Sequence, residues 1–201
     1  WSGQFEYMQR AIQKLKVVIP LTLLIVFLLL YLNFNRIGET LIVLLSVPFA
    51  LVGGVWLLYW LEYNLSVAVA VGFIALVGVA AETGVVMLIY LNKAVEEHRA
   101  RAQQEGRALT SEDLREAVME GAVLRVRPKM MTVVAIMAGL LPIMWSSGTG
   151  SEVMRRIAAP MVGGMISATV LTLIVIPAIF ALVAEARLAR ESKGLRSAEP
   201  V

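Results

Sequence analysis

The sequence predicts an all-α, polytopic membrane helix bundle with five transmembrane helices. The first observation is composition: 59% of the 201 residues are hydrophobic, and the mean hydropathy is +0.77. Soluble domains are nearer to 45–50% apolar, so this chain is too hydrophobic for that class. The second observation is that the apolar residues gather in long runs, and a helix needs about 20 of them to cross the hydrocarbon core.

Five apolar runs define the expected spans. They are residues 17–32, 41–61, 65–91, 130–145 and 157–183. The first and fourth are short for a span, so we expect their helices to continue into the flanking residues. Prolines lie in or beside several runs, which membrane helices tolerate, and we expect kinks there. The chain then divides into a periplasmic end (1–16), three transmembrane helices (17–91), a cytoplasmic loop (92–129), two more transmembrane helices (130–183) and a cytoplasmic tail (184–201).

The orientation follows from the positive charges beside the spans. Residues 92–129 carry eight Lys and Arg residues and the tail after residue 183 carries four. Cytoplasmic loops are enriched in these residues, and five spans place the loop and the tail on the same side. The sequence therefore predicts a multi-pass membrane protein with a cytoplasmic C-terminus.

The long basic loop contains the pattern of a helix. Thr110 and Asp113 have the spacing of a helix N-cap, and Leu114, Val118 and Ala122 recur at helical intervals. This pattern favours an amphipathic helix lying on the inner membrane surface. A solvated helical loop explains the same pattern equally well.

Several protein classes are excluded by composition. The chain has no cysteine and a single histidine, His98, which excludes thiolate chemistry and a His-rich zinc centre. The run at 148–151 has the glycines of a phosphate loop but lacks its lysine. We therefore expect no enzyme, no bound cofactor and no nucleic-acid partner. Because the chain begins at Trp1 in a polar context, we expect it to be part of a longer protein.

Small residues cluster on three of the runs. Gly53 and Gly54 lie on the second, Gly72 and Gly84 on the third, and Gly163 with Gly164 on the fifth. Such faces let helix backbones approach closely. We expect some of them to contact helices outside this chain.

Glu82 is the residue that points most directly to function. It lies near the middle of the third apolar run, where a carboxylate costs at least about 2.5 kcal/mol and is usually retained for function. Desolvation favours its neutral form and a nearby cation favours its charged form, so a group held between the two can load and release a proton. The alternative is a permanently protonated carboxyl bonded to a neighbouring helix.

Three further polar residues are candidates to serve Glu82. Lys129, at the start of the fourth run, is the nearest candidate cation, although it also fits an ordinary lysine that extends to the interface. Thr83 and Thr132 could relay protons or could only bond backbone carbonyls.

Methionines form the second functional signal. Met154, Met161 and Met165 recur at i, i+7 and i+11, which is about one helical face if the fifth helix begins before its apolar run, and thioethers suit monovalent copper or silver. Methionine is also a common filler of hydrophobic cores, which explains most of them as packing. Met154 lies at the membrane edge beside Arg155 and Arg156, where packing explains it least.

Several ordered motifs resemble the resistance–nodulation–division (RND) efflux permeases from residue 5 to about residue 183. They are VPFALVGG at 47–54, EGA at 120–122, LRVRP at 124–128, MT at 131–132, GLLP at 139–142 and GGM at 163–165. The runs GVAAE at 78–82, GVVM at 84–87, RPK at 127–129 and GSEVMRRIAAPM at 150–161 are similar to the copper and silver exporters of its heavy-metal branch. Drug exporters carry Lys-Asn where this chain has Glu82-Thr83.

The resemblance implies that the chain forms the last five spans of a twelve-span, proton-driven permease. It further implies a homotrimer in the bacterial inner membrane, surrounded by lipid. This homotrimer would work with a periplasmic adaptor and an outer-membrane channel. Glu82, Lys129, Thr83 and Thr132 would belong to the proton relay, with an acidic partner in a span outside this chain, and Met154 would hand over the metal. Copper or silver is then the cargo and the proton the coupling ion.

Two other functions remain open at this point. An exporter of divalent zinc, cobalt or cadmium is the nearer one, although such permeases tend to carry an uncharged residue at the position of Glu82. The other is a non-transporting scaffold or protein-translocation subunit, which would gain little from an acid in the middle of the membrane.

Overall fold

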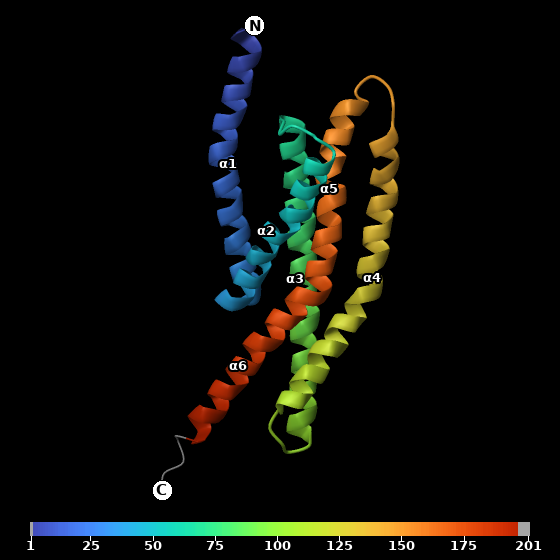
Figure 1. Ribbon diagram of the computed structural model, residues 1–201. Helices are drawn as coiled ribbons and strands as arrows, with labels where there is room; N and C mark the ends of the chain where they lie inside the picture. The colour runs from blue at the N-terminus through green and yellow to red at the C-terminus, as the bar shows by residue number, and fades with distance from the viewer. Residues whose placement is uncertain (1, 197–201) are drawn as a thin grey trace. The chain divides into compact units, whose positions relative to one another are not determined.

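The computed structural model describes residues 2–196, and in that part of the chain every regular element is helical (Figure 1). The elements are α1 (Ser2–Phe34), α2 (Ile37–Trp60), α3 (Val67–Gln104), α4 (Ser111–Trp145), α5 (Ser151–Val170), a π-helical turn η1 (Leu171–Val175) and α6 (Ile176–Arg196). Five helical segments are long and apolar enough to cross a membrane. This confirms the expected all-α membrane bundle.

The chain consists of two compact units, Trp1–Leu41 and Ile42–Val201. The first contains α1 and the turn into α2. In that turn Asn35 adopts a positive φ of 52°, and its N–H donates to the Tyr31 carbonyl at 2.8 Å. Arg36 then pairs with Glu39 at 3.4 Å, which places an acid in the first turn of α2, where the helix dipole favours it.

The second unit differs from the expected loop at 92–129. Residues 92–104 continue α3, and residues 111–129 form the first half of α4 without a break. The two stretches form a helical hairpin, and the placement of its α4 arm on the membrane surface stays a prediction. The reason is packing: Leu91 of α3 and Ala117 of α4 are both fully buried, so this stretch of α4 is covered by α3.

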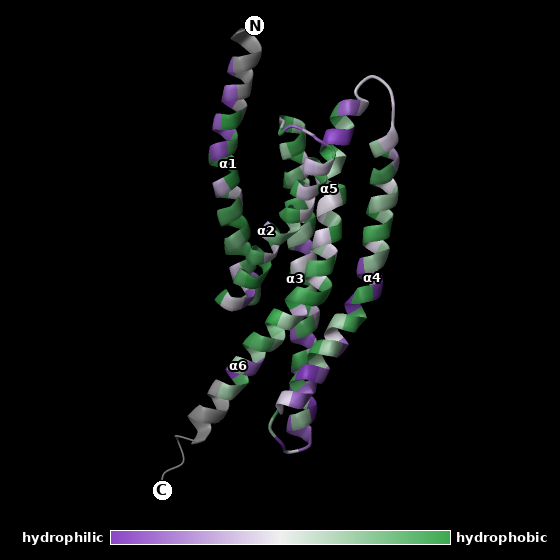
Figure 2. Ribbon diagram, in the orientation of Figure 1, coloured by the Kyte–Doolittle hydropathy of each residue, from purple (hydrophilic) through white to green (hydrophobic). Residues whose placement is uncertain are grey.

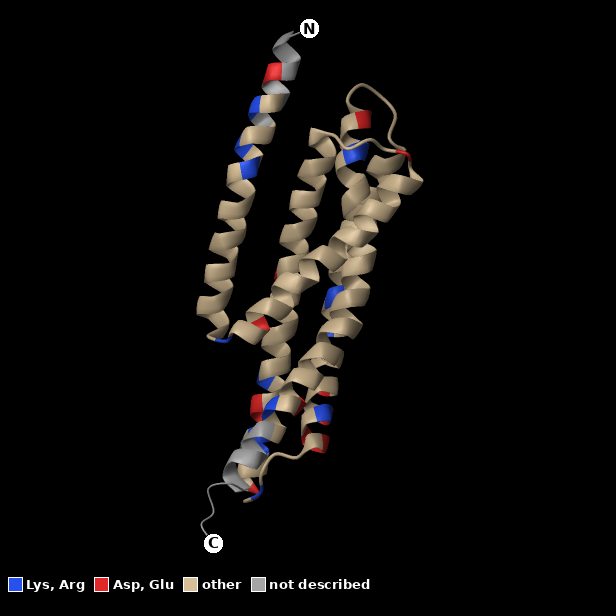
Figure 3. Cartoon of the chain, turned by 60° about the vertical axis from the view of Figure 1, so that its left-hand side comes forward, with Lys and Arg blue, Asp and Glu red and all other residues tan. Residues whose placement is uncertain are grey.

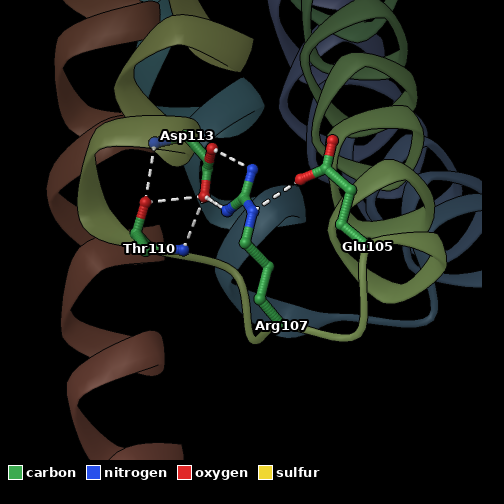
Figure 4. A network of polar contacts seen from close by, with 4 residues as sticks. All are labelled: Glu105, Arg107, Thr110 and Asp113. Carbon is green, nitrogen blue, oxygen red and sulfur yellow. Dashed lines mark hydrogen bonds and ion pairs between the residues drawn. The ribbon is translucent and has the colours of Figure 1, made fainter.

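A network of polar side chains closes the α3–α4 turn (Figure 4). Thr110 Oγ1 accepts from the Asp113 N–H at 3.2 Å, and Asp113 Oδ2 accepts from the Thr110 N–H at 2.9 Å, which makes a reciprocal capping box. Arg107 donates to Asp113 at 2.5 Å and to Glu105 at 2.7 Å. These carboxylates raise the pKa of Arg107 above its ordinary value. The turn is thus tied to both helices.

Glycines allow α2 and α3 to approach α5. A Cβ added at Gly53 would meet the Gly163 carbonyl oxygen, and one at Gly72 would meet the Ile157 carbonyl and the Pro160 ring. The expectation of close backbone approach is confirmed at these positions. At Gly78 an added Cβ would meet nothing within 4 Å, so that position faces away from the other described helices.

The fifth apolar run forms a bent helix rather than a straight one. The Ile176 N–H bonds to the Leu171 carbonyl, five residues back, in the π-helical turn. Pro177 follows directly and has no N–H to continue the helical hydrogen bonds. Beyond this point α6 runs away from the α5 direction (Figure 1), and Glu185 on α6 accepts from Arg115 on α4 at 2.8 Å. Residues 197–201 of the expected tail lie outside the described residues.

Polarity is divided along the second unit. In Figure 2 the middle of α3 and the half of α4 that lies away from the α3–α4 turn are mainly hydrophobic, and hydrophilic residues gather toward that turn. Figure 3 shows the same division for charge, with acidic and basic residues together near that turn. We call this region the polar end of the hairpin. Its charges match the loop that the sequence placed in the cytoplasm.

Candidate functional site

Glu82 lies in the apolar half of α3 and is exposed on the surface of the described bundle. The next residue, Thr83, is half-buried. An acid in this position has no bulk water to stabilise it once lipid or further helices cover the bundle.

Lys129 is placed where it can act on Glu82. It lies on α4, is only 5% exposed, and interacts electrostatically with the Glu82 carboxylate and the Arg125 guanidinium. Among the described residues no direct ion pair joins Glu82 to Lys129. The burial argues against a lysine extending freely to an interface, because such a side chain keeps its ammonium in water.

The two threonines are bound to their own helices. Thr83 Oγ1 donates to the Val79 carbonyl at 2.5 Å, and Thr132 Oγ1 donates to the Pro128 carbonyl at 3.1 Å. Both bonds are local i to i−4 contacts, which threonine commonly makes inside helices. In this arrangement neither hydroxyl donates to Glu82 or Lys129, and a relay role would require each to rotate.

The α3–α4 interface contains two further polar contacts that sequence reasoning did not assign. The Arg125 guanidinium lies over the Tyr90 ring, 5.1 Å from its centroid. Nearer the turn, His98 Nε2 lies 2.9 Å from Glu120 Oε2. Each contact joins residues far apart in the chain, so no local spacing could have indicated it. The only signal was that His98 is the sole histidine.

Met154 lies at the opposite end from the α3–α4 turn, in the first helical turn of α5. It is 53% exposed, whereas Met165 further along the helix is 1% exposed. Packing therefore accounts for Met165 and leaves Met154 unexplained. Its thioether is a suitable ligand for a soft monovalent ion.

The residues after Met154 fix the start of α5. Arg155 donates to the Ser146 carbonyl in the α4–α5 connection. Arg156 pairs with Glu152 at 2.9 Å and lies over the Tyr63 ring, 5.5 Å from its centroid. The two arginines thus join the start of α5 to both neighbouring connections.

Comparison with known proteins identifies the family. Residues 1–184 match the model of the AcrB/AcrD/AcrF family. The chain belongs to this family. The resemblance to RND permeases that the sequence motifs indicated is therefore confirmed, and the chain is a multi-pass membrane protein.

The chain's relatives include heavy-metal transporters. It is 58% identical over 182 residues to "Cation efflux system protein CusA" of Escherichia coli (strain K12), which covers 90% of this chain and 17% of that protein. It is 58% identical over 183 residues to "Putative cation efflux system protein SilA" of Salmonella typhimurium, covering 91% and 17%. Identity to "Cobalt-zinc-cadmium resistance protein CzcA" of Cupriavidus metallidurans is 41%, covering 90% and 16%.

A solved structure gives the same fold. The crystal structure described as "a heavy metal efflux pump, crystal form II" superposes with a TM-score of 0.76 at 37% identity, covering 91% of this chain and 17% of that one. The similarity to heavy-metal permeases confirms the branch that the sequence indicated. The chain spans about a sixth of the length of these relatives.

Proposed function

We propose that this chain supplies the last five spans of an inner-membrane permease that exports copper or silver in exchange for protons. The observation that carries the proposal is the placement of Glu82 and the buried Lys129 on facing helices of an apolar bundle. The choice of metal is supported by the higher identity to CusA and SilA than to CzcA.

In this proposal Glu82 is the proton carrier and Lys129 controls its charge. The proton bound to Glu82 neutralises it, and the Lys129 ammonium favours its release. A proton moving down 100 mV supplies about 2.3 kcal/mol, which can bias one conformation of the helices over another. Thr83 and Thr132 are assigned as auxiliary groups of the relay, and Met154 as a ligand on the metal path.

The proposal also sets the assembly and its surroundings. The permease is a homotrimer that works with a periplasmic adaptor and an outer-membrane channel, and its C-terminus is cytoplasmic. Copper or silver is cargo and the proton the coupling ion. The chain has no bound cofactor and catalyses no reaction of its own. The family relationship supports this assembly.

The decisive experiment is Glu82→Gln in the full-length permease, reconstituted in vesicles with a pH-sensitive dye inside. We expect metal-dependent proton flux to be abolished, since Gln cannot carry a proton. Glu116→Gln, an exposed acid on α4, is the matched control and should keep normal flux. Unchanged flux in Glu82→Gln would refute the assignment.

The metal is decided separately by resistance of cells under competition between ions. Protection against copper and silver, with none against zinc, cobalt or cadmium, is the expected result. Protection against the divalent ions alone would favour the CzcA-like alternative. If deletion left metal resistance unchanged, the protein would be a scaffold rather than a transporter.

A further inference from the structure

His98 is the only histidine of the chain, and the structure places it inside the α3–α4 hairpin. Its side chain is 10% exposed, and Nε2 is 2.9 Å from the Glu120 carboxylate, whose side chain is 43% exposed. One ring nitrogen thus contacts a group that itself reaches solvent. An imidazole ring can accept a proton on one nitrogen and give one up from the other.

His98 and Glu120 form the last of three polar contacts along the α3–α4 interface. The first is the electrostatic interaction of Glu82 with Lys129. The second is the cation–π contact of Arg125 with Tyr90. In each case one residue comes from α3 and the other from α4. The α3 members are eight residues apart, which is about 12 Å of helix per step.

The surroundings of this last contact connect it to the polar end of the hairpin. Arg101 of α3 interacts electrostatically with Glu120. On the side of α6, Glu185 is paired with Arg115 of α4 at 2.8 Å. Glu120 is the acidic group that the structure places in hydrogen-bond contact with the His98 ring.

We propose that His98 and Glu120 form the proton-release site of the permease, at the polar end of the α3–α4 interface. Because consecutive contacts lie about 12 Å apart along α3, the proton released from Glu82 crosses each gap by way of water that enters the interface, and it then binds Nδ1 of His98. The ring then donates its Nε2 proton to the Glu120 carboxylate, which gives it up to water. Exchange between the two ring tautomers restores the starting state. The proposal rests on the proton-driven transport proposed above and names a further group in the same path.

The alternative role for His98 is a simple interhelical hydrogen bond, and His98→Gln separates the two. Gln keeps an N–H that can donate to Glu120, so a structural role survives while proton transfer does not. In vesicles containing the full-length permease, we expect His98→Gln to lower metal-dependent proton flux about tenfold or more, since positioned acid–base groups contribute that much or more.

Chemical rescue and a matched control complete the test. Added 4-methylimidazole should restore flux in His98→Gln, because it replaces the missing proton carrier. Arg115→Gln breaks the α4–α6 contact at the same end without removing an imidazole ring, and it should leave proton flux unchanged. Normal flux in His98→Gln, or a loss of flux that imidazole does not restore, overturns the proposal.

The two proposals fail in different ways. If Glu82→Gln stops flux while His98→Gln has the flux of the unmodified permease, only the release site is wrong. If Glu82→Gln transports protons normally, the proposed function itself is wrong, whatever His98→Gln does.

Discussion

The contact between α2 and α5 leaves no room for a side chain at Gly163, and Gly163→Ala measures how much stability depends on this. A Cβ at Gly163 would fall on the Gly53 carbonyl oxygen and would lie 2.7 Å from Leu57 Cβ. The carbonyl belongs to the helix backbone, so relief requires the two helices to separate. Forcing extra atoms into a packed contact costs about 1–3 kcal/mol.

Gly139→Ala is the matched control for this prediction. Gly139 also lies within a helix, and a Cβ there would meet nothing within 4 Å of the described residues. Both substitutions gain the roughly 1 kcal/mol by which Ala exceeds Gly in helix propensity. The difference between the two variants therefore isolates the packing cost, and we expect Gly163→Ala to be the less stable by about 1–3 kcal/mol.

The assay is reversible unfolding of the full-length permease in mixed micelles, followed by circular dichroism and compared under one detergent composition. A lower midpoint for Gly163→Ala than for Gly139→Ala is the expected result. Equal stability of the two variants would refute the reasoning, because it would mean that α2 and α5 do not approach closely in the membrane.

Three further predictions concern the hairpin, the relay and the metal path. Thr110→Ala should destabilise the first turn of α4 by about 0.5–2 kcal/mol, through loss of the cap, and speed its amide hydrogen exchange. Lys129→Met should abolish metal-dependent proton flux, because it removes the cation that interacts with the Glu82 carboxylate across the α3–α4 interface. Met154→Ile should lower the copper or silver concentration that cells tolerate, since it removes the thioether and keeps an apolar side chain.

The predictions for Lys129 and Met154 each have a control within the chain. Arg127→Met removes an exposed cation near Lys129 and should leave proton flux unchanged. Met131, which is 65% exposed on α4, can be replaced by Ile without loss of tolerance. Unaltered hydrogen exchange in Thr110→Ala would show that Arg107 and Asp113 hold the turn without the cap. Equal effects of the paired substitutions would remove the specific roles given to Lys129 and Met154.

The number of helices and their apolar stretches could be predicted because each is a local property of the sequence. The cap at Thr110 and Asp113 was also local, and the structure contains it. The continuous course of α4 through 111–129 was not recognised, because the charged residues and Pro128 interrupt the apolar pattern there. Packing against α3 overrides that interruption, and burial on a neighbour is not a property of a single segment.

Other features could not be predicted because they depend on neighbours distant in the sequence. The bond between His98 and Glu120 joins residues 22 apart, and the burial of Lys129 comes from the packing of its helix. The π-helical turn at Leu171–Val175 is composed of ordinary apolar residues, and only the nearby Pro177 distinguishes it. Glu82 was recognised in the sequence because a lone acid in an apolar run needs no tertiary information.

The uninterrupted length of α3 has a mechanical consequence. At 38 residues the helix is about 57 Å long. The hydrocarbon core of a bilayer is about 30 Å thick, so nearly half of the helix extends beyond that core. A tilt of about 5° around its centre would move each end by about 2.5 Å, by the same rise per residue. Because the capped turn joins α3 to α4, a small movement of α3 inside the bilayer also moves the end of the hairpin, and neither helix has to unwind.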